Sequence, residues 1–172
     1  MNKVAIKKEE FIPCEKSHLY GIKSTHLLAK KLGVLVKDLE RFANKSVYRV
    51  FNLKDSGRRV EEPPPALQAI HRKIHRYLAR IEAPTYLHSA IKGRSYISNA
   101  TAHIGIAPMI KIDVKKFFPS VPQHKVMHFF RDHMQCASDV AGLLANLTCR
   151  NGRLPTGGAA SPILSYYSFK SM

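Results

Sequence analysis

The feature that most constrains the fold is a long amphipathic segment between Pro63 and Pro84. Proline is tolerated in the first turn of a helix but not in its interior, so the prolines at 63–65 predict a helix start and Pro84 predicts its end. Apolar residues recur in between at intervals of three or four, which places them on one helical face; they are Leu67, Ile70, Ile74, Leu78 and Ile81. The segment is therefore predicted to be the longest helix of the chain.

Shorter helical patterns lie on both sides of it. Ser24 and Thr25 offer an N-cap for a helix that ends at Gly33. The other expected helices span residues 36–43, 123–133, 138–149 and 161–172. Their apolar residues again follow helical spacing, and a turn at 151–152 separates the last two helices.

Two stretches are typical of strands. In residues 48–53 (YRVFNL) apolar and polar side chains alternate, and the turn residues 54–57 then lead into a return strand that starts at Arg58. This pattern predicts a hairpin with a basic tip. Residues 109–114 (MIKIDV) read as a buried strand. Helices followed by a mixed region predict the α+β class.

The charge is strongly positive. The 172 residues hold 28 Lys and Arg against 12 Asp and Glu, a formal net charge of +16. Such a chain is attracted to polyanions, because each neutralised phosphate releases condensed counterions. The basic residues are spread along the whole length, which disfavours a membrane-surface helix. Nucleic acid is therefore the expected partner.

The cellular compartment follows from what the sequence lacks. The first eleven residues are charged and have no apolar core of a signal peptide, and no apolar run is long enough to span a bilayer. The three cysteines are odd in number and lack CxxC spacing, which fits a reducing compartment. We expect a cytoplasmic protein that does not associate with membranes.

Asp113 is the acidic residue that stands out. After Glu82 the chain holds three acids, and Asp132 and Asp139 flank expected helix ends. Asp113 instead ends an apolar strand pattern, where a carboxylate can bind Mg²⁺, which prefers hard oxygen ligands. The alternative is an aspartate that caps a loop.

Two further patterns suit the binding of phosphate groups, and each also has a simpler structural interpretation. The hairpin tip carries Lys54, Arg58 and Arg59, which suit triphosphate oxygens or are simply solvated. The loop at 154–158 (LPTGG) exposes backbone N–H groups to a nucleotide or template, or is an ordinary glycine turn before a helix.

Two histidine pairs have the i, i+4 spacing of a zinc site. They are His71 with His75 and His124 with His128. Neither pair has the glutamate of HExxH, and no third ligand is evident. We interpret them as surface histidines on basic helices.

The order of these patterns resembles that of bacterial reverse transcriptases, and of the retron branch in particular. Residues 59–80 look like the family's first block, and residues 111–121 are similar to motif A, IDxxxFFxxI. Residues 154–162 resemble motif B, and residues 99–103 fit NAxxH, a signature of the retron branch. The resemblance implies an N-terminal helical extension at 1–45, a fingers-like region at 46–106 and a partial palm at 107–172, without a thumb.

The resemblance also implies a role for each matching position. Asp113 and the carbonyl of Val114 would bind the two Mg²⁺ ions of RNA-directed DNA synthesis. The dNTP would contact Lys54, Arg59, Val114, Phe117, Phe118, Thr156 and Gly157. Phe118 falls at the steric gate against a ribose 2′-hydroxyl. A structured noncoding RNA, both template and primer, would contact Asn99, His103, Arg72 and Arg76. Such systems often take part in anti-phage defence.

The sequence departs from the family pattern in two places. Thr156 stands where motif B usually has Gln, and no acid follows Asp139, so motif C (Tyr-x-Asp-Asp) is absent from these residues. One carboxylate holds two Mg²⁺ ions poorly. We therefore expect a truncated polymerase that is inactive alone, unless a second polypeptide supplies motif C. The alternatives are a catalytically dead RNA-binding module and a group II intron-type reverse transcriptase, against which NAxxH argues.

Overall fold

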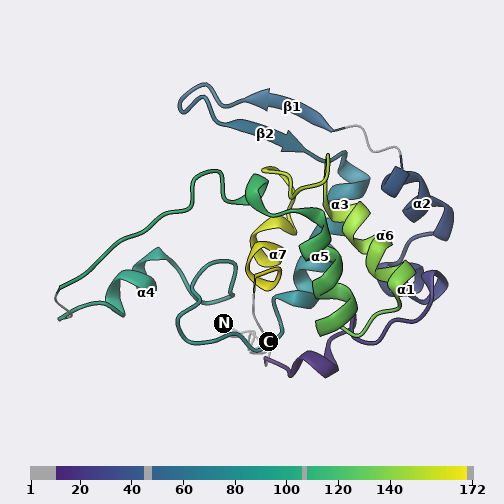
Figure 1. Ribbon diagram of the computed structural model, residues 1–172, viewed down its shortest axis with the longest axis horizontal. Helices are drawn as coiled ribbons and strands as arrows, with labels where there is room; N and C mark the ends of the chain where they lie inside the picture. The colour runs from purple at the N-terminus through teal and green to yellow at the C-terminus, as the bar shows by residue number, and fades with distance from the viewer. Residues whose placement is uncertain (1–10, 45–47, 106–107, 170–172) are drawn as a thin grey trace, which may run out of the picture.

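Short helices account for most of the regular secondary structure in the computed structural model, which describes residues 11–44, 48–105 and 108–169 (Figure 1). The α-helices are α1 (Thr25–Leu32), α2 (Val36–Asn44), α3 (Pro65–Leu78), α4 (Tyr96–Thr101), α5 (Gln123–His128), α6 (Ser138–Thr148) and α7 (Ser161–Tyr167). They are joined by two 3₁₀ turns, η1 (Cys14–Lys16) and η2 (Phe118–Ser120), and by the π-helical turn η3 (Phe129–His133). The described structure is thus mostly helical, with one small antiparallel sheet of two strands.

Helix α3 confirms the prediction from the proline-bounded segment. It begins at Pro65 with Pro64 as its N-cap, and its apolar stripe is buried against α1, α6 and α7. The chain leaves the helix at Ala79, and Ile81, the last residue of the stripe, is buried in a bridge with Ile12. Because four turns of one helix bury a continuous apolar face, α3 anchors the core.

The other predicted helices are present with similar bounds. The side chain of Ser24 accepts a hydrogen bond from the Leu27 N–H at the start of α1, and Gly33 ends that helix with φ of 66°. The predicted helix at 123–133 forms as α5 continued by the π-helical turn. The last helix was predicted to reach residue 172, but α7 ends at Tyr167, and residues 170–172 lie outside the described residues. No helix in the described part of the chain is long and apolar enough to cross a bilayer.

The predicted hairpin is also present. Strand β1 (Arg49–Asn52) pairs with β2 (Arg59–Glu62), with Arg49 opposite Glu62 and Asn52 opposite Arg59. Hydrogen bonds from the Leu53 N–H to the Arg58 carbonyl and from the Gly57 N–H to the Leu53 carbonyl close the turn. Figure 1 shows the hairpin lying along one side of the helical body.

The predicted strand at 109–114 is wrong. Residues 84–105 and 108–117 form an arm that leaves the body after α3, carries α4 at its far end and returns to η2 (Figure 1). Residues 109–114 are exposed on its returning limb, with Ile110 and Ile112 at 87% and 86% relative accessibility. A strand needs a neighbour for its N–H and C=O groups, and no described segment bonds to this one.

Candidate nucleotide-binding site

Three segments that are far apart in the sequence meet at one cavity of about 720 Å³. They are the hairpin tip and β2, the turn that leads into η2, and the loop before α7. The lining residues are Gly57, Arg58, Arg59, Glu61, Lys116, Phe117, Phe118, Pro119, Arg153 and Thr156. The volume is in the range of small-molecule sites. The lining combines four cations, one carboxylate and two aromatic rings.

The hairpin contributes two of the cations. Gly57 has φ of 63°, a conformation that glycine adopts without steric cost, and this lets the chain reverse directly before Arg58 and Arg59. Arg59 then starts β2 and pairs with Asn52, so its backbone is held by the sheet. Both side chains are exposed at the mouth of the cavity.

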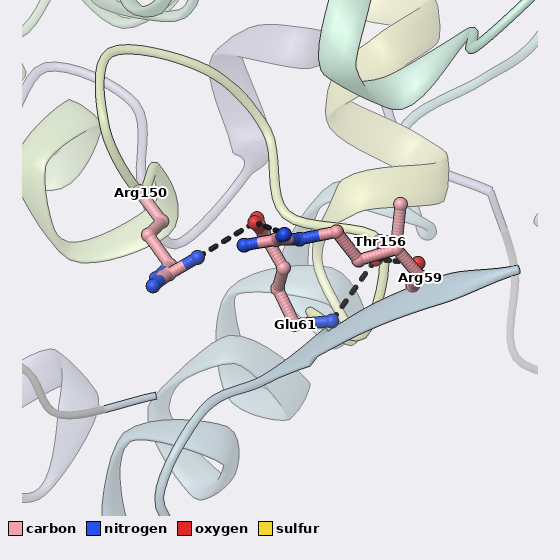
Figure 2. A network of polar contacts seen from close by, with 4 residues as sticks. All are labelled: Arg59, Glu61, Arg150 and Thr156. Atoms are coloured by element: carbon pink, nitrogen blue, oxygen red, sulfur yellow. Dashed lines mark hydrogen bonds and ion pairs between the residues drawn. The ribbon is translucent and has the colours of Figure 1, made fainter. Parts of the chain in front are cut away.

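Glu61 is the acidic residue of the cavity and is buried, and Figure 2 shows its carboxylate between Arg59 and Arg150. Its Oε1 accepts a hydrogen bond from Arg150 Nη1 at 2.6 Å and lies 3.4 Å from Arg59 Nε. A buried carboxylate needs such partners, because burial removes its hydration. Arg150 is thereby neutralised, and Arg59 is held beside the cavity.

Thr156 fastens the loop to the hairpin through its hydroxyl. The hydroxyl accepts a hydrogen bond from the Glu61 N–H at 3.0 Å and donates one to the Arg59 carbonyl at 2.9 Å (Figure 2). The hydroxyl therefore hydrogen-bonds to an N–H and a carbonyl of the β2 backbone, as a neighbouring strand would. Thr156 lines the cavity, and its hydroxyl is directed to the hairpin.

Gly157 brings the loop backbone into direct contact with β2. Its N–H donates to the Glu61 carbonyl at 3.1 Å, and a Cβ placed on Gly157 would lie 2.7 Å from that carbonyl oxygen. A larger residue would push the loop away from the strand. The close approach that this glycine allows in the structure is to β2, and the predicted approach to a nucleotide or template stays a prediction.

Helix α3 holds the other side of the same loop. Gln68 Nε2 donates to the Gly157 carbonyl at 2.9 Å, and its Oε1 accepts from the Ala159 N–H at 3.1 Å. His71 lies one turn further along and is fully buried beneath Gly158, where a Cβ on Gly158 would lie 3.0 Å from His71 Nδ1. The loop is thus held by hydrogen bonds to β2 on one side and to α3 on the other.

The interpretation of His71 as a surface histidine is wrong. His71 falls on the apolar stripe of α3, four residues after Leu67, and its Nε2 hydrogen-bonds to the Leu147 carbonyl at 2.7 Å. Because that carbonyl only accepts, Nε2 carries the proton in the neutral ring. Burial lowers the pKa of His71 to about 4, and the bond to Leu147 opposes the shift. His75 is half-buried, whereas His124 and His128 are exposed as predicted.

The aromatic wall comes from the end of the arm. Phe117 and Phe118 contact each other, with ring centroids 5.8 Å apart, and both line the cavity. Lys116 precedes them with φ of 53°, an uncommon conformation for a residue with a side chain. Phe117 also borders a second, mainly aromatic cavity of about 580 Å³ that includes Tyr86, Val114 and Tyr166.

The structure brings four of the predicted nucleotide-binding residues together: Arg59, Phe117, Phe118 and Thr156. Gly157 lies directly behind them. Lys54 is exposed in the hairpin turn and does not line this cavity, and Val114 lines the second one. The roles of all these residues in nucleotide binding stay predictions.

Asp113 is exposed on the arm and lines neither cavity. Within the described residues, no group of three or more His, Cys, Asp or Glu side chains is placed to hold a metal ion. A hard cation such as Mg²⁺ prefers several oxygen ligands, and Asp113 with its neighbouring carbonyl provides a fraction of that number. The described residues therefore do not fit a complete Mg²⁺ site.

The predicted RNA contacts are exposed but lie in two places. Arg72 and Arg76 project from α3 on the helical body, whereas Asn99 and His103 belong to α4 and the turn after it on the arm. Figure 1 shows α4 well away from α3. An RNA that contacts both pairs must therefore extend across the molecule.

Four cavity or network residues were missed by the sequence reasoning: Glu61, Lys116, Arg150 and Arg153. Glu61 was detectable in principle, because the side chain at 61 falls two residues after Arg59 on the same face of β2. The two arginines flank the turn at 151–152, and nothing in their spacing indicates that one is paired and the other is not. Their separate environments appear only in three dimensions.

Comparison with known proteins finds curated retron reverse transcriptases. The chain is 32% identical over 156 residues to the retron Se72 reverse transcriptase of Salmonella heidelberg, a match that covers 86% of this chain and 41% of that protein. It is 32% identical over 123 residues to the retron Mx162 reverse transcriptase of Myxococcus xanthus, covering 66% and 25% of the two chains. The retron Ec86 reverse transcriptase of Escherichia coli is 27% identical over 124 residues, a match that covers 69% of this chain and 38% of that protein. No protein-family model matches.

These matches define the class as reverse transcriptase-related. More narrowly, the chain is a homologue of the retron reverse transcriptases over most of its own length, as the motif order predicted. The match is partial in one direction, since the chain spans less than half the length of these curated relatives.

Proposed function

We propose that this chain forms the nucleotide-binding part of a retron-type RNA-directed DNA polymerase, with fingers and a partial palm. The observation that supports it is the single cavity where the basic hairpin, the two phenylalanines after Asp113 and the loop with Thr156 meet. The relatives are named as retron reverse transcriptases, which favours this branch over a group II intron-type enzyme.

The chemistry of the cavity suits a dNTP. Arg58 and Arg59 at its mouth are matched to phosphate oxygens, which guanidinium groups bind with two parallel N–H donors. The rings of Phe117 and Phe118 offer a flat apolar surface against which a sugar or base can pack. In this proposal Phe118 excludes a ribose 2′-hydroxyl, and Thr156 and Gly157 set the distance between the hairpin and the loop.

Asp113 is proposed as one Mg²⁺ ligand of the complete polymerase. Because the described residues do not fit a whole site, we propose that further carboxylates come from a segment of the Tyr-x-Asp-Asp type, which the present sequence does not contain. That segment belongs either to a longer form of the same chain or to a second polypeptide. The present residues by themselves are expected to bind substrates without joining them.

RNA binding is proposed for the exposed basic surfaces. With a formal charge of +16, the chain should bind a structured RNA through its phosphates, with Arg72 and Arg76 on α3 and with Asn99 and His103 around α4. A catalytically dead RNA-binding module is the second candidate. It is favoured by the position of Asp113, which has no acidic cluster around it among the described residues.

A primer-extension assay with Mg²⁺ and dNTPs separates these two functions. We expect no extension from this chain alone, and extension after addition of a segment that carries Tyr-x-Asp-Asp, with loss of activity in Asp113→Asn. A dead module would stay inactive in every combination. Extension by this chain alone, abolished by Asp113→Asn, would contradict the expectation of incompleteness.

The nucleic-acid part is tested by filter binding over a salt series. The affinity for a hairpin RNA should fall steeply as salt rises, because bound phosphates release counterions. Arg72→Ala with Arg76→Ala should reduce the slope by about one for each phosphate that the variant no longer neutralises. An affinity that does not change with salt would argue against phosphate binding.

A further inference from the structure

The cations around the cavity are not equivalent, because some of them form an ion pair with Glu61 and others do not. Arg150 forms a 2.6 Å ion pair with Glu61, and Arg59 lies 3.4 Å from the same carboxylate oxygen. Arg58, Lys116 and Arg153 also line the cavity, and within the described ranges no carboxylate forms an ion pair with them. Three cationic residues of this cavity therefore have no ion-pair partner in the described part of the chain.

Arg153 is held on a rigid base. The turn before it uses Asn151 and Gly152 with φ of 50° and 76°, and the Arg150 N–H donates to the Arg153 carbonyl at 2.8 Å. The neighbouring residues are also fixed, since the Gln123 N–H donates to the Gly152 carbonyl and the Leu154 N–H to the Val121 carbonyl. The backbone of Arg153 is thus immobilised while its side chain stays exposed.

We infer that Arg153 is a phosphate-binding residue of this cavity, with Lys116 as a second cation from another wall. The inference rests on the proposed nucleotide site and extends it, because neither residue belongs to the positions that the motifs assign. The ligand is the triphosphate of a nucleotide. Its negative charges match a cavity in which the hairpin supplies Arg58 from one segment and Arg153 and Lys116 come from two others.

Arg153 is expected to contribute considerably to the affinity for the triphosphate. An arginine on a fixed backbone loses no further backbone freedom when it binds, and hydrogen bonds between charged groups contribute about 1.5–3 kcal/mol, which corresponds to roughly 10- to 100-fold in affinity. Arg150, three residues earlier in the same turn, should contribute nothing directly, because Glu61 already occupies its guanidinium.

Titration calorimetry with the whole chain tests this. The probes are inorganic tripolyphosphate, dGTP, deoxyguanosine and a short single-stranded RNA. Arg153→Ala and Arg153→Gln should weaken tripolyphosphate and dGTP at least about tenfold and leave deoxyguanosine unchanged. The matched control is Arg41→Ala, which removes the same charge from an exposed ion pair with Asp38 on α2. Thermal melting verifies that all variants are folded.

Each result decides a different claim. If the wild type binds dGTP and tripolyphosphate but Arg153→Ala behaves like Arg41→Ala, the role of Arg153 is overturned and the nucleotide site stands. If Arg153→Ala weakens RNA and leaves tripolyphosphate unchanged, Arg153 contacts a strand and the inference is wrong. If the wild type binds neither phosphate probe, the nucleotide site itself fails, and the inference fails with it.

Discussion

Two stretches of this chain have nearly the same pattern of apolar and polar residues, but only one of the two forms a strand. Residues 48–53 and 109–114 both alternate apolar and polar side chains, as strands do. The first forms β1, because a short turn returns β2 beside it. The second stays exposed on the arm with no neighbour among the described segments. Alternation thus indicates the ability to form a strand, and a partner within reach decides whether one forms.

The two regions also differ in how firmly they are attached. The hairpin is fixed to the loop before α7 by Glu61, Thr156 and Gly157, and the loop is fixed to α3 by Gln68. The exposed segment of the arm has no comparable contacts in the described structure. Substitutions in the first region should therefore be costly, and substitutions in the second should have little effect.

The largest effect is expected for Glu61→Ala. It removes the partner of Arg150, whose side chain is 21% exposed, and leaves that charge largely buried without compensation. The free energy of unfolding should fall by about 3–4 kcal/mol, measured by urea denaturation. Glu62→Ala is the matched control, because the Glu62–Arg49 pair is exposed at 3.9 Å and should contribute less than about 1 kcal/mol. Equal losses in the two variants would mean that the Glu61 network does not hold the hairpin.

A pH series probes the support beneath the loop. His71 has a pKa of about 4 in the folded state, below its ordinary value of 6.5, so the unfolded chain binds more protons between these two values. The stabilisation is therefore complete above pH 6.5 and is lost as the pH falls toward 4, by up to about 3 kcal/mol. His71→Leu should remove this part of the pH dependence. Parallel curves for the two proteins would contradict a buried neutral histidine.

Gly157→Ala should have a smaller effect on the same contact. The added Cβ would meet the Glu61 carbonyl at 2.7 Å and force the loop and β2 apart, which should lower stability by about 2 kcal/mol in thermal or urea unfolding. Gly142→Ala on α6 has open space around its Cβ and should stabilise the helix slightly. If Gly157→Ala leaves the free energy of unfolding unchanged, the loop does not press against the strand.

The smallest effect is expected on the arm. Ile112 is 86% exposed, so Ile112→Lys should change the free energy of unfolding by less than about 0.5 kcal/mol. Leu154→Lys provides the contrast, since Leu154 is fully buried behind the cavity and should not tolerate a charge. A loss of more than about 1 kcal/mol in Ile112→Lys would mean that residues 109–114 pack against the body and that the contrast is wrong.

Local rules predicted most of the elements. The prolines before α3, the Ser24 and Gly33 caps of α1, and the turn between β1 and β2 each depend on a few neighbouring residues, and each is present. His71 and residues 109–114 were misassigned, because burial of a histidine and pairing of a strand depend on distant segments. The same limit applied to the cavity, where Arg150 and Arg153 look alike in sequence.

The sequence by itself determined the helical core, the hairpin, the positive charge and the family, because periodicity, turn chemistry and motif order are local or cumulative properties. The tertiary structure alone decided which cations are paired, since Glu61 and Arg150 are 89 residues apart and meet only when the loop docks on β2. It also decided that Thr156 hydrogen-bonds to the hairpin and that Asp113 lies exposed without an acidic cluster among the described residues. Electrostatic pairing depends on distance in space, and spacing along the chain does not encode it.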